Sequence, residues 1–480
     1  MALKLYNTLG RRVMDFVPIE PGKAGFYGCG PTVYNYAHIG NLRAYVFDDL
    51  LVRTLRYLGY EVTHVMNITD VGHLTGDDDS GEDKMLKSAA ERRESVLDVA
   101  RYYTDAFFAD TDSLNIEKPN VICKATDHIP EMIALIKRIE EKGFTYSAGG
   151  NLYFDVSKFP AYGELAMLKL DELQHGARID VDKHKRNPMD FALWFTKSKF
   201  EDQALQWDSP WGRGYPGWHV ECSAMSMKYL GDNFDIHAGG IDHIPVHHTN
   251  EIAQSEAATG KRWVNYWLHN EFLVMGSSKM SKSAGGFITL KTLVDASYSP
   301  LDYRYFLLGG HYRSQLQFSY DALDSARASR KSLNDRLLAI KAKAGSAPIP
   351  PTSGLGKAAI ARLDAFKLAL EDDLSSPKAM AELWGLLKDQ SIAPAEALAA
   401  AYDMDRVLGL GLKQLEEPVG ADPELLAWVE SMIAERTKAK ADKDWAKADA
   451  IRDELKLKGV VLEDSPSGTK WRLMDTVVRS

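Results

Sequence analysis

Cysteine is scarce in this chain, which has only three such residues among 480: Cys29, Cys123 and Cys222. So few thiols exclude a disulfide framework in a chain of this length. Each cysteine is therefore a candidate for a buried packing residue, a nucleophile or a metal ligand, and its sequence neighbours must decide among these roles.

Long apolar runs are absent as well. No stretch of about 18 apolar residues occurs, and residues 1–12 contain no long apolar segment. We therefore expect neither a signal peptide nor a membrane-spanning helix, and we expect a cytoplasmic protein.

The chain also lacks an excess of positive charge, with 58 Lys and Arg against 67 Asp and Glu and a net charge of -9. This balance excludes a globally basic protein that coats nucleic acid, so any contact with RNA must come from local patches. Because 45% of the residues are hydrophobic, large cores are possible, and the length indicates about three domains.

A strand, a helix and a second strand open the chain. A short strand is predicted over 24–27, an amphipathic helix from Asn41 to Leu58 and a strand from Glu61 to Ile68. Such a unit pairs its strands in parallel and binds its ligand where the first strand meets the helix. The fold class predicted is α/β, with a Rossmann-type parallel sheet and a nucleotide pocket near residues 29–41.

Domain boundaries follow from changes in pattern. We assign residues 1–320 to the Rossmann-type catalytic domain, with an insertion at about 110–210 that contains a helix and a strand. An all-α helical domain follows over 321–420, interrupted by a Pro- and Gly-rich stretch at 345–351. The last part, 421–480, is a small C-terminal element with helices and a predicted hairpin that joins 460–462 to 471–473.

Two separated motifs indicate phosphate binding. The first, His38-Ile39-Gly40-Asn41, lies at the predicted helix start, where backbone N–H groups attract phosphate and Gly40 allows close approach. The second places Lys279 and Lys282 on a polar loop, where two ammonium groups suit a triphosphate. Taken singly, His38 could be a cap or packing residue, and the lysines a solvated basic loop.

A metal site is a further hypothesis, based on Cys29, Cys222, His247 and Glu251. On a helix, His247 and Glu251 would share one face, and two thiolates would complete a tetrahedral set suited to zinc. From spacing alone the alternatives stay open, because an isolated cysteine is often a small buried hydrophobe and His with Glu four residues later is often a surface pair.

Taken together, the two phosphate motifs resemble the signatures of class I aminoacyl-tRNA synthetases. Their surroundings resemble those of the cysteinyl-tRNA synthetase family over nearly the whole chain. The matching segments are 27–34, 67–71, 211–212, 216–223, 237–242, 443–449 and 468–472.

The resemblance implies a cysteine–tRNA ligase. Such an enzyme joins cysteine to ATP as cysteinyl-adenylate, releases pyrophosphate, and transfers cysteine to the 3′ end of tRNA(Cys). It implies one zinc ion on Cys29, Cys222, His247 and Glu251, which binds the substrate thiolate and excludes serine. Magnesium is expected to accompany ATP, and a monomer is expected.

The resemblance also implies roles for other residues. Thr69 and Trp218 would line the cysteine pocket, while Gly40, Asp242 and Lys282 would bind ATP, with Asp242 near the ribose. The catalytic residues implied are His38, Asn41, Lys279 and Lys282, although Asn41 stands where the family often has a second histidine. Cys123 matches no ligand position, which indicates a structural role.

The C-terminal element resembles the family's anticodon-recognising region. There a basic helical face and a stacking Trp471 would contact RNA, or else they form a solvated helix and a core tryptophan. The residues of that face are Arg436, Lys438, Lys440, Lys443 and Lys447. Two other functions remain open: a ligase that joins cysteine to an amino sugar through the same adenylate, and a non-catalytic paralogue that binds tRNA or senses cysteine.

Overall fold

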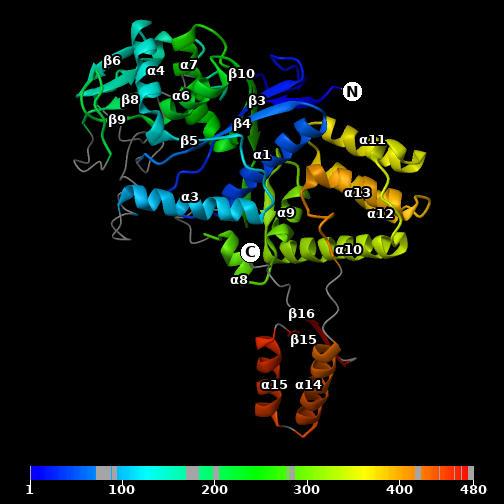
Figure 1. Ribbon diagram of the computed structural model, residues 1–480. Helices are drawn as coiled ribbons and strands as arrows, with labels where there is room; N and C mark the ends of the chain where they lie inside the picture. The colour runs from blue at the N-terminus through cyan, green and yellow to red at the C-terminus, as the bar shows by residue number, and fades with distance from the viewer. Residues whose placement is uncertain are drawn as a thin grey trace. The chain divides into compact units, whose positions relative to one another are not determined.

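The computed structural model describes residues 2–71, 88, 95–168, 183–197, 205–276, 278–279, 287–416, 423–442, 444–458, 460–465 and 468–473 (Figure 1). The chain divides into two compact units, Met1–Lys413 and Gln414–Ser480. The helices over 321–413 thus belong to the same compact unit as the sheet that precedes them. No helix in the described ranges combines the length and the apolar character needed to cross a bilayer.

A five-stranded parallel sheet forms the centre of the first unit. Its order is β11 (Val264–Asn270), β10 (Phe234–Gly240), β3 (Lys23–Gly28), β4 (Glu61–Ile68) and β5 (Val121–Lys124). Every neighbouring pair is parallel. The strand order reverses between β3 and β10, and ligands bind at such a point, beyond the carboxyl ends of the strands. The predicted Rossmann-type fold is confirmed.

Helix α1 (Ile39–Tyr57) connects β3 to β4. Its buried face includes Leu42, Val46 and Leu50, which repeat at the spacing of one helix face and pack on the sheet. The predicted helix and both predicted strands are confirmed to within two residues. The N-terminus of α1 therefore lies at the carboxyl edge of the sheet.

An insertion separates the two halves of the sheet. It contains α4 (Ile129–Glu141) and an antiparallel sheet of β6 (Thr145–Ala148), β7 (Asn151–Phe154), β8 (Phe191–Phe195) and β9 (Tyr215–Pro216). Helices α3 (Val96–Ser113), α6 (Trp218–Leu230) and α7 (Thr249–Thr259) complete this part of the first unit. Aromatic side chains such as Phe154, Phe191 and Trp194 fill the core where the insertion meets the sheet.

The remaining strands and helices of the first unit include the N-terminal strands and the helices that follow the lysine loop. The strands are β1 (Lys4–Asn7), β2 (Arg12–Asp15), β12 (Leu273–Met275), β13 (Ser278–Lys279) and β14 (Leu316–Phe318). The helices are α8 (Leu290–Asp295), α9 (Pro300–Leu308), α10 (Tyr320–Ala344), α11 (Lys357–Glu371), α12 (Ser376–Lys388) and α13 (Pro394–Leu408). Helices α10 to α13 form a bundle beside α1 (Figure 1), and the Pro- and Gly-rich stretch at 345–351 lies between α10 and α11.

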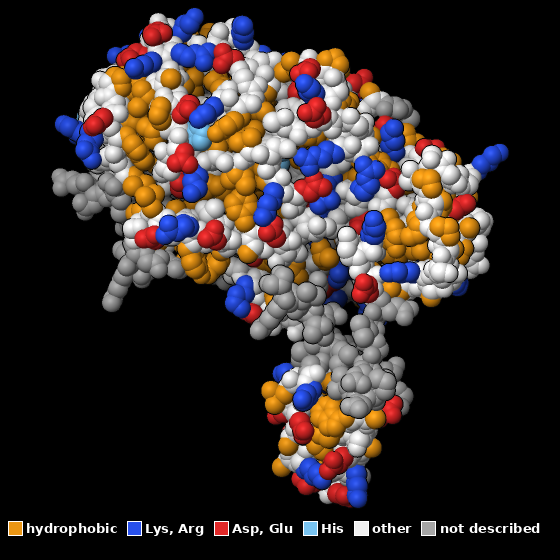
Figure 2. Space-filling view, viewed as in Figure 1, with side chains coloured by type: hydrophobic (Ala, Val, Ile, Leu, Met, Phe, Trp, Pro, Cys, Tyr) orange, Lys and Arg blue, Asp and Glu red, His pale blue; other side chains and the backbone are white. Residues whose placement is uncertain are grey.

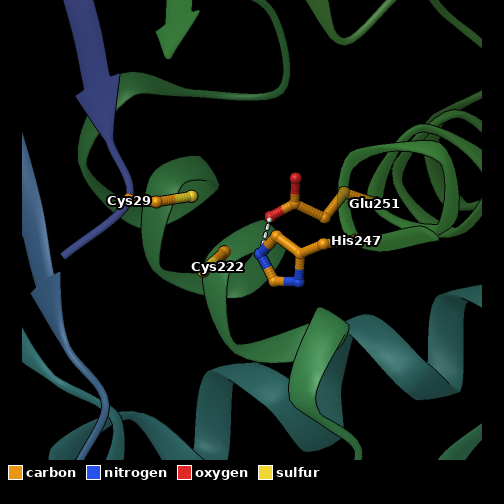
Figure 3. Close-up of side chains that lie close together, drawn as sticks. All are labelled: Cys29, Cys222, His247 and Glu251. Atoms are coloured by element: carbon orange, nitrogen blue, oxygen red, sulfur yellow. Dashed lines mark ion pairs between the residues drawn. The ribbon is translucent and has the colours of Figure 1, made fainter. Parts of the chain in front are cut away.

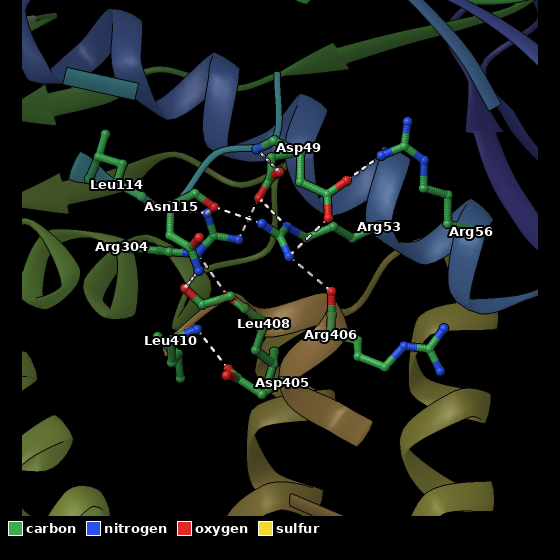
Figure 4. A network of polar contacts seen from close by, with 12 residues as sticks. Asp49, Arg53, Arg56, Leu114, Asn115, Arg304, Asp405, Arg406, Leu408 and Leu410 are labelled. Atoms are coloured by element: carbon green, nitrogen blue, oxygen red, sulfur yellow. Dashed lines mark hydrogen bonds and ion pairs between the residues drawn. The ribbon is translucent and has the colours of Figure 1, made fainter. Parts of the chain in front are cut away.

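A buried charged junction joins α1 to the bundle (Figure 4). Arg304 of α9 is fully buried, and its Nη2 lies 2.5 Å from Oδ2 of Asp49 in α1. The same guanidinium donates to the carbonyl of Leu408 at 2.7 Å and to that of Leu114 at 2.9 Å. Arg53 of α1 also pairs with Asp49, at 2.8 Å. Through Arg304, the buried carboxylate of Asp49 thus links α1 to α9, to Leu114 at the end of α3 and to Leu408 at the end of α13.

The second unit consists of α14 (Pro423–Ala441), α15 (Trp445–Leu457) and the antiparallel hairpin of β15 (Val460–Ser465) and β16 (Gly468–Leu473). The predicted hairpin is confirmed. One residue of the predicted basic face is wrong: Arg436 is only 3% exposed, so it is buried and cannot form part of an exposed face. Lys443 and the side chain of Trp471 fall outside the described residues. On the face shown in Figure 2, acidic and basic side chains are interspersed over both units, as the overall charge balance suggests.

Candidate active site and metal centre

Three buried side chains and the half-buried Cys29 meet at the reversal point of the sheet (Figure 3). Cys29 directly follows β3, Cys222 lies in α6, His247 lies in a π-helical turn over Ile244–His248, and Glu251 lies in the first turn of α7. One ligand atom from each residue lies within 4.8 Å of the others. The helical turn that precedes α7 continues into it, so His247 and Glu251 do share a face, with Nε2 and Oε1 3.3 Å apart.

The members of this cluster shift one another's pKa values. The hydrogen bond with Cys222 holds the pKa of Cys29 well above its usual range, and burial and the negative groups nearby act in the same direction. The same hydrogen bond lowers the pKa of Cys222 to about 6. Burial opposes the charge on His247, but Glu251 and Cys222 together outweigh burial and raise the pKa of His247 to about 10.

This donor set fits a zinc ion. Two soft sulfur ligands, one imidazole and one carboxylate are the types that zinc takes in four-coordinate sites, and all four are buried or half-buried. A bound cation would replace the protons on Cys29 and His247, because metal ligands bind in their deprotonated forms.

Further histidines surround the cluster. His248 Nε2 lies 3.4 Å from Sγ of Cys29, its Nδ1 lies 2.7 Å from Nε2 of His269, and Nδ1 of His269 lies 2.7 Å from the hydroxyl of Thr8. Burial, together with neighbouring histidines, holds the pKa of His248 and of His269 well below the usual value. His237 Nε2 lies 3.2 Å from Glu251. The sequence showed only that histidines concentrate between 219 and 248, and it gave no signal for Thr8.

His38 and Asn41 cap the N-terminus of α1 reciprocally. Asn41 N–H donates to Nδ1 of His38 at 3.0 Å, and His38 N–H donates to Oδ1 of Asn41 at 3.3 Å. Because Nδ1 accepts, a neutral His38 ring carries its proton on Nε2. A Cβ on Gly40 would lie 3.0 Å from the His38 ring, so a larger residue at this position would crowd the ring. Asn41 therefore has a structural partner that sequence reasoning missed.

The lysine loop begins and ends beside the same helix start. Lys279 lies in β13, which pairs with β12, and its side chain is outside the described residues, as is all of Lys282. After the loop, the carbonyl of Ile288 accepts from Ile39 N–H at 2.8 Å, and Thr289 pairs with His38. The segment that follows the lysine loop thus contacts the start of the first phosphate motif, although the two motifs are about 240 residues apart in sequence.

Three more predicted residues lie at the carboxyl edge of the sheet. Thr69 follows β4 and its hydroxyl accepts from the Asn67 amide at 2.9 Å. Trp218 opens α6, with its ring centroid 4.5 Å from that of His247. Asp242 follows β10 and is exposed. Their positions suit a ligand bound over the cluster, and Cys123 lies apart, buried with its Sγ 3.5 Å from the carbonyl of Met66.

Comparison with known protein families gives two matches along the chain. Residues 15–328, more than half of the chain, match the family described as tRNA synthetases class I (C) catalytic domain. Residues 422–472 match the cysteinyl-tRNA ligase anticodon binding domain.

Several solved structures share the fold. The methionyl-tRNA synthetase of Mycobacterium tuberculosis bound by methionyl-adenylate has a TM-score of 0.59 at 17% identity, over 82% of this chain and 95% of that one. The LeuRS of Agrobacterium radiobacter K84 agnB2, in a ternary complex, has a TM-score of 0.56 at 11% identity, over 84% of this chain and 85% of that one. At these identities the likeness supports the fold alone.

Relatives with higher identity carry one name. A cysteine–tRNA ligase of Treponema denticola is 59% identical over 98% of this chain and 100% of its own length. Those of Treponema pallidum (strain Nichols) and Borrelia garinii subsp. bavariensis are 48% and 45% identical, again over 98% of this chain. With these matches over almost its whole length, the chain belongs to the cysteine–tRNA ligase family of class I aminoacyl-tRNA synthetases.

Proposed function

We propose that this enzyme activates cysteine with ATP and esterifies it to the 3′ end of tRNA(Cys), and that it selects cysteine through a zinc ion on Cys29, Cys222, His247 and Glu251. The observation that carries the proposal is the meeting of these four ligand atoms within 4.8 Å, at the carboxyl edge of the sheet that also bears the start of α1. The match of residues 422–472 to an anticodon-binding family supports tRNA, rather than an amino sugar, as the acceptor.

Substrate selection is the first task of such a site. Serine is almost isosteric with cysteine, and an ordinary pocket separates such pairs by only about 1–3 kcal/mol. When bound, zinc would supply a soft Lewis acid that takes the substrate sulfur as thiolate and binds an alcohol poorly. Around it, Trp218 and Thr69 would confine the small cysteine side chain. The nearby histidines with lowered pKa values would be neutral, so they would add no charge to that of the metal and its ligands.

Activation is then a matter of position and charge. The cysteine carboxylate oxygen bonds to the α-phosphorus of ATP while the bond to pyrophosphate breaks, so negative charge grows on the departing group. Since Nδ1 of His38 accepts in the cap, the ring proton lies on Nε2, and this N–H would donate to a phosphate oxygen. The dipole of α1 acts in the same direction, and Lys279 and Lys282, with magnesium on ATP, would hold the β- and γ-phosphates. Asp242 would bind the ribose.

Transfer follows from the same geometry. The oxygen of a terminal ribose hydroxyl of tRNA bonds to the cysteinyl carbonyl carbon, the bond from that carbon to AMP breaks, and the hydroxyl proton leaves with AMP. No protein nucleophile is needed in either step, so catalysis comes from alignment and electrostatic stabilisation. The sequence-based predictions of a monomeric and cytoplasmic enzyme stay predictions.

The test is cysteine-dependent exchange of labelled pyrophosphate into ATP, run beside serine, with the zinc content of the same preparation and charging of purified tRNA(Cys). We expect one zinc per chain and a strong preference for cysteine. Cys222→Ser should lose zinc and discrimination, whereas Cys123→Ser, at a buried thiol outside the cluster, should keep both. Equal exchange with serine by the zinc-loaded enzyme would contradict the selection mechanism, and an absence of charging would contradict tRNA as acceptor.

A further inference from the structure

A cavity lies outside the metal cluster and outside both phosphate motifs. It has a volume of about 570 Å³ and is lined by residues of α3, of the turn that follows β5 and of the loop before β9. Its lining consists of Leu97, Thr126, Asp127, Leu205, Gln206, Trp207 and Arg213. The size is typical of a small-ligand site, so the lining side chains indicate what it would hold.

The cavity adjoins the reaction centre through Asp70. This residue follows Thr69, and its carboxylate accepts from Thr126 N–H at 2.9 Å and from the Thr126 hydroxyl at 2.7 Å. Thr126 and Asp127 belong to the turn over Ala125–His128, directly after β5. One wall of the cavity is therefore fixed to the same sheet edge at which cysteine would be activated.

The opposite wall is a rigid loop of the insertion. Trp207 and Gly214 exchange both backbone hydrogen bonds, at 2.7 and 2.9 Å. The carbonyl of Gly212 accepts from the Trp194 indole at 3.2 Å, and the Trp211 indole donates to Glu140 at 3.1 Å. A Cβ on Gly214 would lie 1.8 Å from the carbonyl oxygen of Phe195, so glycine is required there. These contacts hold the backbone on either side of Arg213 and at Trp207.

The lining fits an unpaired nucleotide. The indole of Trp207, which lines the cavity together with Leu97 and Leu205, offers a stacking surface for a base, and the exposed guanidinium of Arg213 offers a partner for a phosphate. The carboxylate of Asp127 can accept from the exocyclic amino group that cytosine and adenine carry. The single-stranded 3′ end of tRNA combines these groups, and it must approach this sheet edge to receive cysteine.

We infer that this cavity binds a nucleotide of the single-stranded tRNA 3′ end, with Trp207 stacking on the base and Arg213 on a phosphate, and that it positions the terminal ribose for transfer. The inference rests on the proposed function, since it assumes tRNA as the acceptor. It assigns these residues to the second step alone. Neither of them belongs to the residues proposed to bind ATP, cysteine or zinc.

The experiment compares the two steps in full-length, zinc-loaded enzyme. Arg213→Gln and Trp207→Leu should leave cysteine-dependent pyrophosphate exchange unchanged. They should slow single-turnover transfer to tRNA(Cys), on the order of tenfold for Arg213→Gln and 10- to 100-fold for Trp207→Leu, the range for lost base stacking. Arg138→Gln, which removes a partly exposed arginine of the insertion that pairs with Asp232, should change neither step.

A truncated tRNA locates the contact. With tRNA that lacks its last three nucleotides, wild type and Arg213→Gln should bind equally, because the interaction is already absent. Equal transfer rates for wild type and both variants would overturn the inference, as would a loss of affinity that persists with the truncated tRNA. Failure of the wild type itself to charge tRNA would instead contradict the proposed function, so the two failures are distinguishable. Because Arg213 is exposed, Arg213→Gln should fold normally and can test the inference even if Trp207→Leu folds poorly.

Discussion

Arg304 offers the sharpest test of how the first unit is held together. Replacing it with methionine removes the ion pair to Asp49 and the hydrogen bonds to the carbonyls of Leu408 and Leu114, all of them buried. Methionine fills part of the space but cannot donate. The carboxylate of Asp49 keeps Arg53 as its partner and accepts from Glu117 N–H, so the loss should be that of one partner in a buried charge network.

The expected cost is about 3–5 kcal/mol, the usual result of removing one member of a buried pair. An unfolding entropy of about 2.1 cal/mol/K per residue over the unit Met1–Lys413 converts this into a Tm decrease of roughly 3–6 °C. Calorimetry of the full-length, zinc-loaded protein measures this change in the main transition.

Arg101→Met is the matched control. Arg101 pairs with Asp98 on the surface of α3, where the side chains are 69% and 49% exposed, and exposed pairs contribute little. Its Tm should stay close to that of the wild type. If Arg304→Met melts at the same temperature as this control, the junction does not hold α1 to the bundle, and the reasoning from buried contacts is wrong.

Three other perturbations address the site and the pH response. Glu251→Gln should weaken zinc binding at least about tenfold in a chelator competition, because an amide replaces the charged ligand; unchanged zinc affinity would exclude this residue as a ligand. Asn41→Ala removes the acceptor for His38 N–H, a cap worth about 1 kcal/mol, and should slow pyrophosphate exchange several-fold. Asn41→Asp keeps an acceptor but adds charge near the triphosphate and should be slower still, so faster exchange by the aspartate variant would refute this role. Burial raises the pKa of Asp110 to about 6, so stability present below its unfolded pKa near 4 is lost as pH rises through 6; Asp110→Asn should therefore melt higher than wild type at pH 8 but not at pH 4.

Local features of the fold were predictable from the sequence. The bounds of β3, α1 and β4 follow from apolar periodicity and from the glycines between the elements, signals that act within a few residues. The hairpin of β15 and β16 follows in the same way from its turn residues. Pairing Cys29 with Cys222, His247 and Glu251 needed more than spacing, and it came from the family resemblance.

Contacts set by topology were not predictable. Thr8 reaches His269 because β1 packs on β11, and nothing near either residue signals the other. Arg436 was placed on an exposed face because its neighbours are lysines, but helix packing in the second unit buries it. Asn41 appeared only as a departure from a family pattern, whereas its hydrogen bonds with His38 depend on the exact helix start.

The order in which the ribosome makes the four clustered residues has a consequence for biogenesis. Cys29 is synthesised about 190 residues before Cys222, an interval of roughly 10–40 s at common elongation rates. Throughout it, β3 lacks its neighbour β10, and the thiol of Cys29 has none of the partners described here. A nascent chain that stops before β10 therefore holds one half of the sheet and only Cys29 or, past the insertion, Cys29 and Cys222 of the proposed ligand set. Metal capture by the proposed site would then require that synthesis has passed the insertion and that the two halves have joined.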